Sequence, residues 1–186
     1  GVRAIQIHTG GMCHLDADMT RQGIREFGTK DLDFVVLENV GNLVCPAEFD
    51  TGAVKNAMIL SVPEGHDKPL KYPLIFTVCD ALIINKIDVL PYFDFDMDKV
   101  KEYAWKRNPN LKIFPISAKT GEGLDRLQAL LEDWVREQRM EIKRLYPYTE
   151  AGKIQLIRAT GKYARKSTRR RESTLKGSFP VNCTQK

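Results

Sequence analysis

Short apolar runs rich in β-branched residues recur along the first 140 residues, and they constrain the fold more than any other feature. Segments with helical periodicity separate them. The strand-like runs lie at residues 3–9, 32–41, 56–65, 80–90 and 111–117, and the helical segments lie at 14–28, 98–110 and 120–140. Apolar strands that alternate with helices predict an α/β fold, with a mostly parallel sheet and helices on both faces. Ligands of such sheets bind beyond the carboxyl ends of the strands.

Positive charge is concentrated at the carboxyl-terminal end of the chain. Residues 141–186 hold 12 Lys and Arg against 3 Asp and Glu, whereas residues 1–140 hold 17 against 21. Aliphatic periodicity is weak after residue 140, which predicts an α/β domain over 1–140 and a basic, disordered or unrelated tail over 141–186. The basic cluster at 162–176 contains a single aromatic residue, Tyr163. That composition disfavours a role in binding nucleic acid.

The cysteines and the hydropathy indicate a cytoplasmic protein. The four cysteines (Cys13, Cys45, Cys79 and Cys183) are scattered, and this spacing is not that of a disulfide scaffold. Cys79 lies in an apolar segment and is expected in the core. No run reaches the roughly 18 apolar residues of a membrane span, and no secretory signal is visible. The first residue is Gly1, so we expect a fragment or a processed product.

The sequence Asn-Lys-Ile-Asp occupies residues 85–88, directly after the apolar run Ala-Leu-Ile-Ile. A carboxylate at this position, Asp88, can accept hydrogen bonds from both N1–H and the exocyclic amine of guanine. Adenine cannot offer that pair of donors, so the contact discriminates between the bases. The stem of Lys86 can lie along the base plane, and Asn85 can tie neighbouring loops together.

A second motif, Ser-Ala-Lys-Thr-Gly at residues 117–121, ends the next expected strand. In GTPases this loop offers a backbone N–H, here that of Ala118, to guanine O6. Two such motifs about 30 residues apart, each at a strand end, predict a guanine nucleotide site. The residues expected to bind the nucleotide are Asn85, Lys86, Asp88, Ser117, Ala118 and Lys119.

The phosphate end of the site is only partly represented. Glu38 and Gly41, in Leu-Glu-Asn-Val-Gly-Asn, match the GTPase pattern of an acid that holds Mg²⁺ and a glycine whose N–H reaches the γ-phosphate. The phosphate-binding motif Gly-x-x-x-x-Gly-Lys-Ser/Thr does not occur in the 186 residues. We expect that motif upstream of Gly1, and without it weak guanine binding and little hydrolysis.

Three stretches together resemble HypB, the GTPase family that helps to insert nickel into nickel–iron hydrogenase. They are Cys-His-Leu-Asp-Ala-Asp-Met at 13–19, the segment 38–50 with 64–73, and 85–96 with 117–123. The resemblance covers about residues 5–138. It implies that residues 1–140 are a partial G-domain, and that the chain acts with GTP/GDP and Mg²⁺.

The resemblance also implies a metal site at a GTP-promoted homodimer interface. Its ligands would be Cys13, His14 and Cys45, and such a thiolate and imidazole set suits Ni²⁺ and Zn²⁺ alike. Taken alone, Cys13 is more typical of a core residue and His14 of a residue at a helix start. Cys45 lies four residues after Gly41, which would couple nucleotide state to metal release. The implied partners are a HypA-type nickel metallochaperone and the precursor of the hydrogenase large subunit.

Two alternatives remain open. One is a urease-type nickel GTPase, against which the adjacent Cys13-His14 pair argues, because that family has a Cys-x-His pattern. The other is a non-hydrolysing metal-binding or dimerisation fragment that has lost the phosphate-binding loop.

Overall fold

The computed structural model describes residues 2–30, 32–147, 149, 152, 155, 162–169 and 172–180. The chain divides into two compact units, residues 1–129 and residues 130–186. No helix among the described residues is long and apolar enough to cross a membrane.

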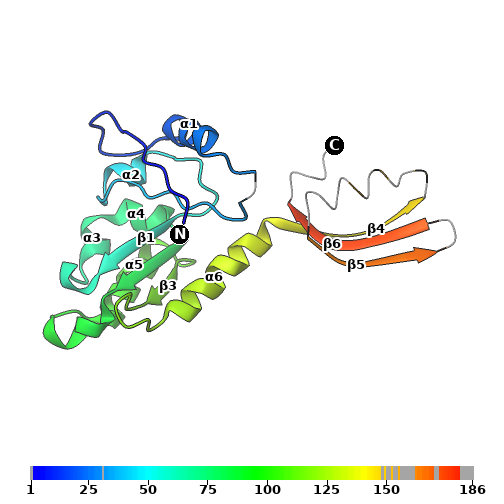
Figure 1. Cartoon of the computed structure of the whole chain (residues 1–186). Coiled ribbons are helices and arrows are strands. Elements are labelled where there is room, and N and C mark those ends of the chain that lie inside the picture. The colour runs from blue at the N-terminus through cyan, green and yellow to red at the C-terminus, as the bar shows by residue number, and fades with distance from the viewer. Residues whose placement is uncertain are drawn as a thin grey trace. The chain divides into compact units, whose positions relative to one another are not determined.

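A three-stranded parallel sheet, β1-β2-β3, organises the first unit (Figure 1). Its strands are β1 (Ala57–Ser61), β2 (Ala81–Asn85) and β3 (Lys112–Pro115). Ser61 pairs with Asn85, and Ile84 pairs with Pro115, so the three carboxyl ends reach one edge of the sheet. This confirms the predicted α/β class and the runs at 56–65, 80–90 and 111–117.

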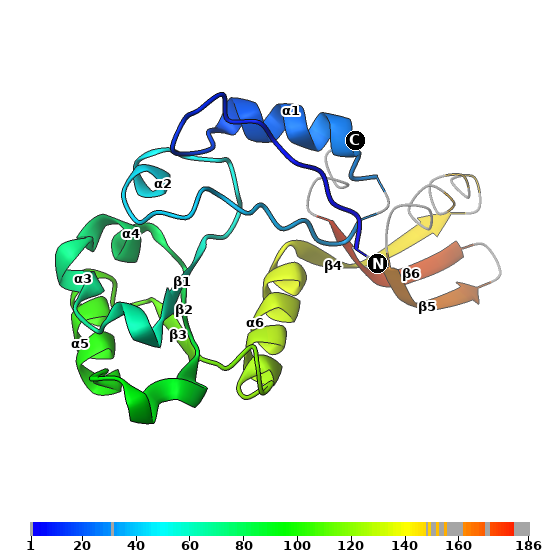
Figure 2. The same cartoon turned by 60° about the vertical axis from the view of Figure 1, so that its left-hand side comes forward.

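Helices flank this sheet on both sides. The bounds are α1 (Ala17–Phe27), α2 (Cys45–Glu48), α3 (Lys68–Lys71), α4 (Pro73–Val78), α5 (Met97–Arg107) and α6 (Leu124–Glu137), with short 3₁₀ turns at Val62–Glu64 (η1) and Ile87–Tyr92 (η2). Figure 2 shows α3, α4 and α5 on one side of the sheet and the start of α6 on the other. Helix α1 ends at Phe27 and is capped by Gly28, next to the predicted end, because glycine adopts the φ of +67° found there.

The core lies between the sheet and helices α4 and α5. Met58, Leu60, Leu82 and Ile84 point from the strands to this side and are buried. Phe76, Val100 and Ala104 meet them from the helices, each with 0% of its surface exposed. Burial of these apolar side chains is the main force that holds the strand ends in place.

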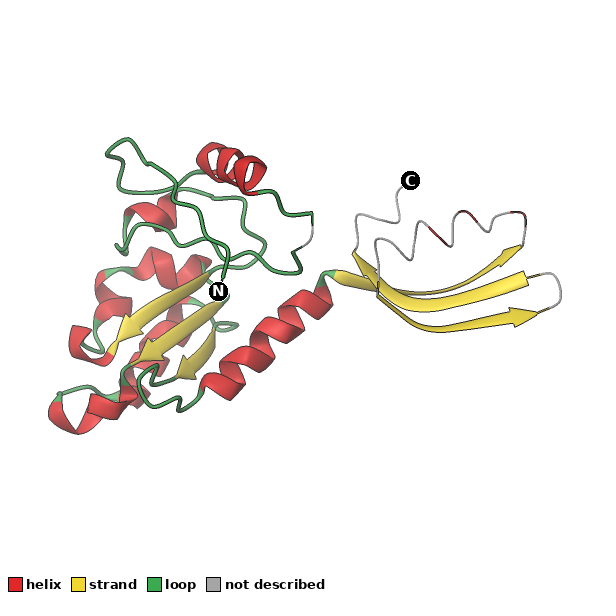
Figure 3. Cartoon of the chain, viewed as in Figure 1, coloured by secondary structure: helices red, strands yellow, loops and turns green. Residues whose placement is uncertain are grey.

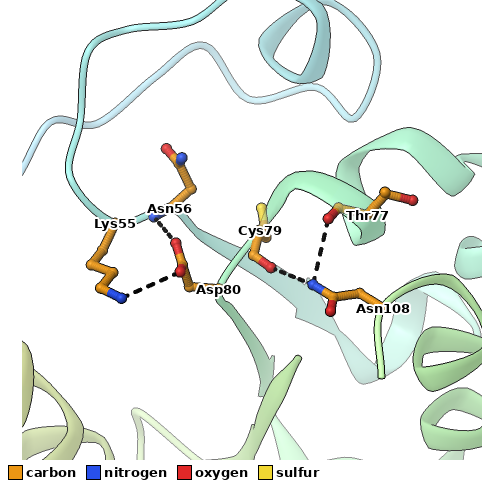
Figure 4. A network of polar contacts seen from close by, with 6 residues as sticks. All are labelled: Lys55, Asn56, Thr77, Cys79, Asp80 and Asn108. Atoms are coloured by element: carbon orange, nitrogen blue, oxygen red, sulfur yellow. Dashed lines mark hydrogen bonds and ion pairs between the residues drawn. The ribbon is translucent and has the colours of Figure 1, made fainter. Parts of the chain in front are cut away.

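The opposite edge of the sheet, at the amino ends of the strands, is fixed by a polar network (Figure 4). Asp80 accepts from the backbone N–H of Asn56 at 2.8 Å and lies 3.6 Å from Lys55 Nζ. The side-chain amide of Asn108 donates to the carbonyl oxygens of Cys79 at 3.0 Å and Thr77 at 3.4 Å. These contacts join the end of α5 to the turn before β2.

Two predicted strands are wrong. Residues 3–9 and 32–41 are loop throughout (Figure 3), and Phe34 and Val36 in the second segment are 44% and 76% exposed. A strand needs a hydrogen-bonded neighbour, and the order β1-β2-β3 gives neither segment one. Glu38 and Gly41 therefore lie in a loop and not at a strand end.

The second unit contains a three-stranded antiparallel sheet in the order β4-β6-β5. Its strands are β4 (Arg139–Pro147), β5 (Lys162–Arg169) and β6 (Glu172–Pro180). The sequence pattern indicated no regular element here, because strand formation depends on cross-strand partners that are distant in sequence. Most of the rest of the predicted tail, including Cys183, lies outside the described residues.

Candidate functional site

The loops that follow β2 and β3 are bonded to each other at the carboxyl edge of the sheet. Asn85 Oδ1 accepts from the backbone N–H of Ala118 at 3.1 Å, across 33 residues of sequence. The same oxygen accepts from the N–H of Lys86 at 2.7 Å. Asn85 therefore ties the two loops together, as the sequence predicted. Guanine O6 would have to share the N–H of Ala118 with Asn85.

Asp88 is held in the same cluster by Ser117. The Ser117 hydroxyl donates to Asp88 Oδ1 at 2.7 Å, and its oxygen accepts from the N–H of Thr120 at 3.1 Å. Ser117 is fully buried, whereas Asp88 is half-buried. A short bond from a buried hydroxyl to a carboxylate fixes the direction in which the carboxylate points.

Lys86 has a left-handed backbone, with φ +65° and ψ +38°. Among the described residues it is the only one other than glycine with a positive φ. This conformation costs a non-glycine residue roughly 1–2 kcal/mol, so the surrounding contacts must enforce it. The exposed side chains of Lys86 and Lys119 leave the two loops toward solvent.

A second group of contacts brings the two predicted thiol ligands together. Cys13 Sγ and Cys45 Sγ are 2.7 Å apart, although 32 residues separate them in sequence. The neighbouring Cys13 thiol raises the pKa of Cys45 above its usual value, chiefly through this contact. Cys13 is exposed and Cys45 half-buried.

His14 lies beside the thiols, and one nitrogen of its ring is buried without a hydrogen-bond partner. It is 7% exposed, and its Nε2 is buried with no hydrogen-bond partner. Its ring stacks on Phe49, with centroids 3.5 Å apart and planes at 9°. Its other nitrogen, Nδ1, lies 3.9 Å from Cys13 Sγ. A buried, unpaired imidazole nitrogen is costly, and such a nitrogen suits a ligand or a partner group.

These donors do not form a ready metal cage within one chain. Among the described residues, no group of three or more His, Cys, Asp or Glu side chains is placed to hold a metal ion. Two sulfurs that each lie about 2.3 Å from one tetrahedral ion are roughly 3.8 Å apart. The thiols at 2.7 Å would therefore have to open by about 1 Å to share an ion.

Two asparagines, which the sequence reasoning missed, hold this region together. Asn42 Nδ2 donates to the carbonyl oxygen of Cys13 at 2.8 Å, and Asn42 Oδ1 accepts from the N–H of Cys45 at 2.9 Å. Asn39 Oδ1 accepts from the N–H of Leu15 at 2.9 Å. The sequence does hold an indication of this role, since two asparagines flank Gly41 and short amide side chains often bond to nearby backbone.

The residues expected at the phosphate end, Glu38 and Gly41, lie in the same loop as Asn39 and Asn42. Glu38 is exposed, and a Cβ on Gly41 would meet nothing within 4 Å. Both lie in the loop that leads to Asn42 and α2. Their roles with Mg²⁺ and the γ-phosphate stay predictions.

Comparison with known proteins places the chain among nucleotide-binding domains. The family described as "CobW/HypB/UreG, nucleotide-binding domain" matches residues 1–115. The chain is 45% identical over 139 residues to hydrogenase maturation factor HypB of Azotobacter chroococcum mcd 1, covering 75% of this chain and 44% of that protein. It is also 45% identical over 139 residues to HypB of Escherichia coli (strain K12), covering 75% and 47%. The chain thus spans about half the length of these relatives.

A solved structure agrees with the sequence relatives. The crystal structure of HypB from Helicobacter pylori in complex with nickel superposes with a TM-score of 0.69 and 43% identity. The match covers 73% of this chain and 65% of that one.

Proposed function

The chain belongs to the CobW/HypB/UreG family of nucleotide-binding domains, and on that premise we propose that it serves GTP-dependent nickel delivery in the maturation of nickel–iron hydrogenase. The observation that carries this proposal is the meeting of Cys13 and Cys45, 2.7 Å apart, beside the unpaired Nε2 of His14. Thiolate and imidazole donors suit Ni²⁺, and Zn²⁺ equally.

Nucleotide recognition rests on the two bonded loops. Asp88 would accept from N1–H and the exocyclic amine of guanine, while Asn85 and Ser117 hold the loops in register. Ala118 would donate to O6, and the stems of Lys86 and Lys119 would border the base. Glu38 would hold Mg²⁺, which neutralises phosphate charge when bound, and Gly41 would donate to the γ-phosphate.

The metal would sit at the seam of a homodimer. One chain offers two thiols and one imidazole, which is fewer donors than a closed four-ligand site needs. A second copy would complete the coordination, and an open, shared site favours transfer over storage. Because Cys45 follows Gly41 by four residues, a change of nucleotide would move a metal ligand. A HypA-type metallochaperone would supply nickel, and a hydrogenase large-subunit precursor would receive it.

A titration with Ni²⁺ and with Zn²⁺ tests the metal site. We expect Cys13→Ala and Cys45→Ala to lose the thiolate-to-nickel absorption that the wild type develops. Cys79→Ala is the matched control, because that thiol is buried in the core, 4% exposed. Unchanged stoichiometry and affinity in both ligand variants would remove the site.

Sedimentation with GDP, and with a GTP analogue that resists hydrolysis, tests the coupling. We expect the analogue to favour a dimer and nickel to strengthen it. The alternative of a non-hydrolysing metal-binding fragment predicts nickel binding and dimerisation without any effect of nucleotide. The urease-type alternative is less favoured, because Cys13 and His14 are adjacent and not separated by one residue.

A further inference from the structure

We infer that Asn42 is a positioning residue that sets the separation of the Cys13 and Cys45 thiols. The inference deepens the metal site proposed above and rests on it. Neither the sequence motifs nor the predicted ligands assign a role to this side chain.

The two ends of the Asn42 amide hold two different ligand-bearing segments. Nδ2 donates to the carbonyl oxygen of Cys13 at 2.8 Å, across 29 residues of sequence. Oδ1 accepts from the N–H of Val44 at 3.0 Å and from the N–H of Cys45 at 2.9 Å. One rigid, planar group therefore fixes the backbone of both thiol-bearing residues at once.

A purely local role does not account for this pattern. The bonds from Oδ1 to Val44 and Cys45 organise the turn before α2, and an aspartate or serine oxygen could make them. The bond from Nδ2 to Cys13 requires a donor on the same short side chain, which aspartate lacks. It contributes nothing to the turn, and its effect is to hold the Cys13 loop against α2.

Asn39 bonds to the same loop one peptide further along the chain. Its Oδ1 accepts from the N–H of Leu15, directly after His14, and from its neighbour Val40. With both asparagines in place, the peptide between Cys13 and His14 and the peptide after His14 are both hydrogen-bonded. The thiols can then open by about 1 Å through side-chain rotation while their backbones stay fixed.

Spectroscopic metal titration tests the inference. Co²⁺ and Ni²⁺ are the probes, and thiolate-to-metal charge-transfer absorption is the signal. We expect Asn42→Ala to weaken binding by roughly 10–100-fold, the usual effect of removing a group that orients metal ligands. Asn42→Asp keeps the acceptor and loses the donor, so we expect it to fold and still to bind more weakly than wild type.

Asn108→Ala is the matched control. Asn108 also donates from Nδ2 to a backbone carbonyl, that of Cys79 at 3.0 Å, and accepts at Oδ1 from the N–H of Asn110 at 3.0 Å. It lies at the amino end of the sheet among residues of the network in Figure 4. Its loss should lower stability and leave the charge-transfer titration unchanged.

A reagent that needs no metal gives a second readout. Phenylarsine oxide bridges two thiols only when they lie close together. We expect Asn42→Ala to be bridged more slowly than wild type and Asn108→Ala. Wild-type behaviour of both Asn42 variants in both assays would overturn the positioning role while leaving the metal site intact. If Cys13→Ala instead keeps the full charge-transfer signal, the metal site itself fails and the inference fails with it.

Discussion

The Ser117 hydroxyl donates to Asp88 Oδ1 at 2.7 Å, and this bond joins two loops that lie 29 residues apart in sequence. It is made by a fully buried donor and a half-buried acceptor. One carboxylate oxygen is fixed from within the protein, so the orientation of the carboxyl group is set before any ligand arrives. Together with the bond between Asn85 and Ala118, it gives the strand-end loops a single arrangement.

Asp88→Asn should change the base that the site prefers. The carboxylate can accept from the exocyclic amine of guanine, whereas an asparagine amide can donate to the oxygen that xanthine carries at that position. We expect the ratio of GDP to XDP affinity to fall by about 10- to 100-fold, the cost of a mismatched polar group. Competition binding with both nucleotides measures it. Asp94→Asn, an exposed residue in the next loop, is the control and should keep the ratio of the wild type.

Much of the first unit could be predicted from local sequence. The apolar runs at 56–65, 80–90 and 111–117 predicted β1, β2 and β3, because such runs favour strands that bury apolar side chains, as Leu60 and Ile84 do. The meeting of Asn85 with Ala118 followed from the rule that parallel strands end at one edge. Helix α6 (Leu124–Glu137) also lies within the helical segment predicted at 120–140.

The predictions that were wrong or missing concern contacts between residues that lie far apart in the sequence. Residues 32–41 have a strand-like composition, yet composition cannot supply a neighbouring strand. The hydrogen bond from Asn42 goes to Cys13, which lies 29 residues earlier, and a local sequence pattern cannot show a contact over that separation. The strands after residue 138 are likewise defined by pairings such as Ile142 with Gly177.

The backbone of Lys86 gives a prediction about stability. Because glycine adopts a left-handed φ without steric cost, Lys86→Gly should be more stable than Lys86→Ala by about 1 kcal/mol. Both variants lose the same side-chain stem, so the comparison isolates the backbone. Denaturant unfolding measures the difference. Equal midpoints for the two variants would show that the loop relaxes and carries no strain.

Asp96 gives a prediction about pH. The backbone N–H groups of Lys99 and Asp98 donate to its Oδ1 at 3.0 Å each, and these bonds, the one from Lys99 first, lower the pKa of the carboxyl. The folded state thus favours the ionised form, so the stabilisation is present above the ordinary pKa of about 3.9. It is lost as the pH falls through the depressed value in the folded protein.

Thermal unfolding of wild type and Asp96→Asn at several pH values checks this effect. Asparagine keeps an acceptor for the two N–H groups but carries no charge. The wild type should have the higher melting temperature near neutral pH, and the gap should narrow below about pH 4. A gap that stays constant with pH would contradict the assignment.

Cys79 should be the least reactive of the three described thiols. It is 4% exposed, and burial, with a smaller effect from Asp80, raises its pKa to about 12. At pH 8 only about one molecule in 10⁴ would carry the thiolate, which is the form that reacts. Iodoacetamide should therefore modify Cys13 and Cys45 in the native protein, and Cys79 only after denaturation. Peptide mass mapping locates each label.

Denatured protein is the control, because all the thiols should react there at similar rates. Labelling of native Cys79 as fast as Cys45 would mean that the core around β2 opens readily.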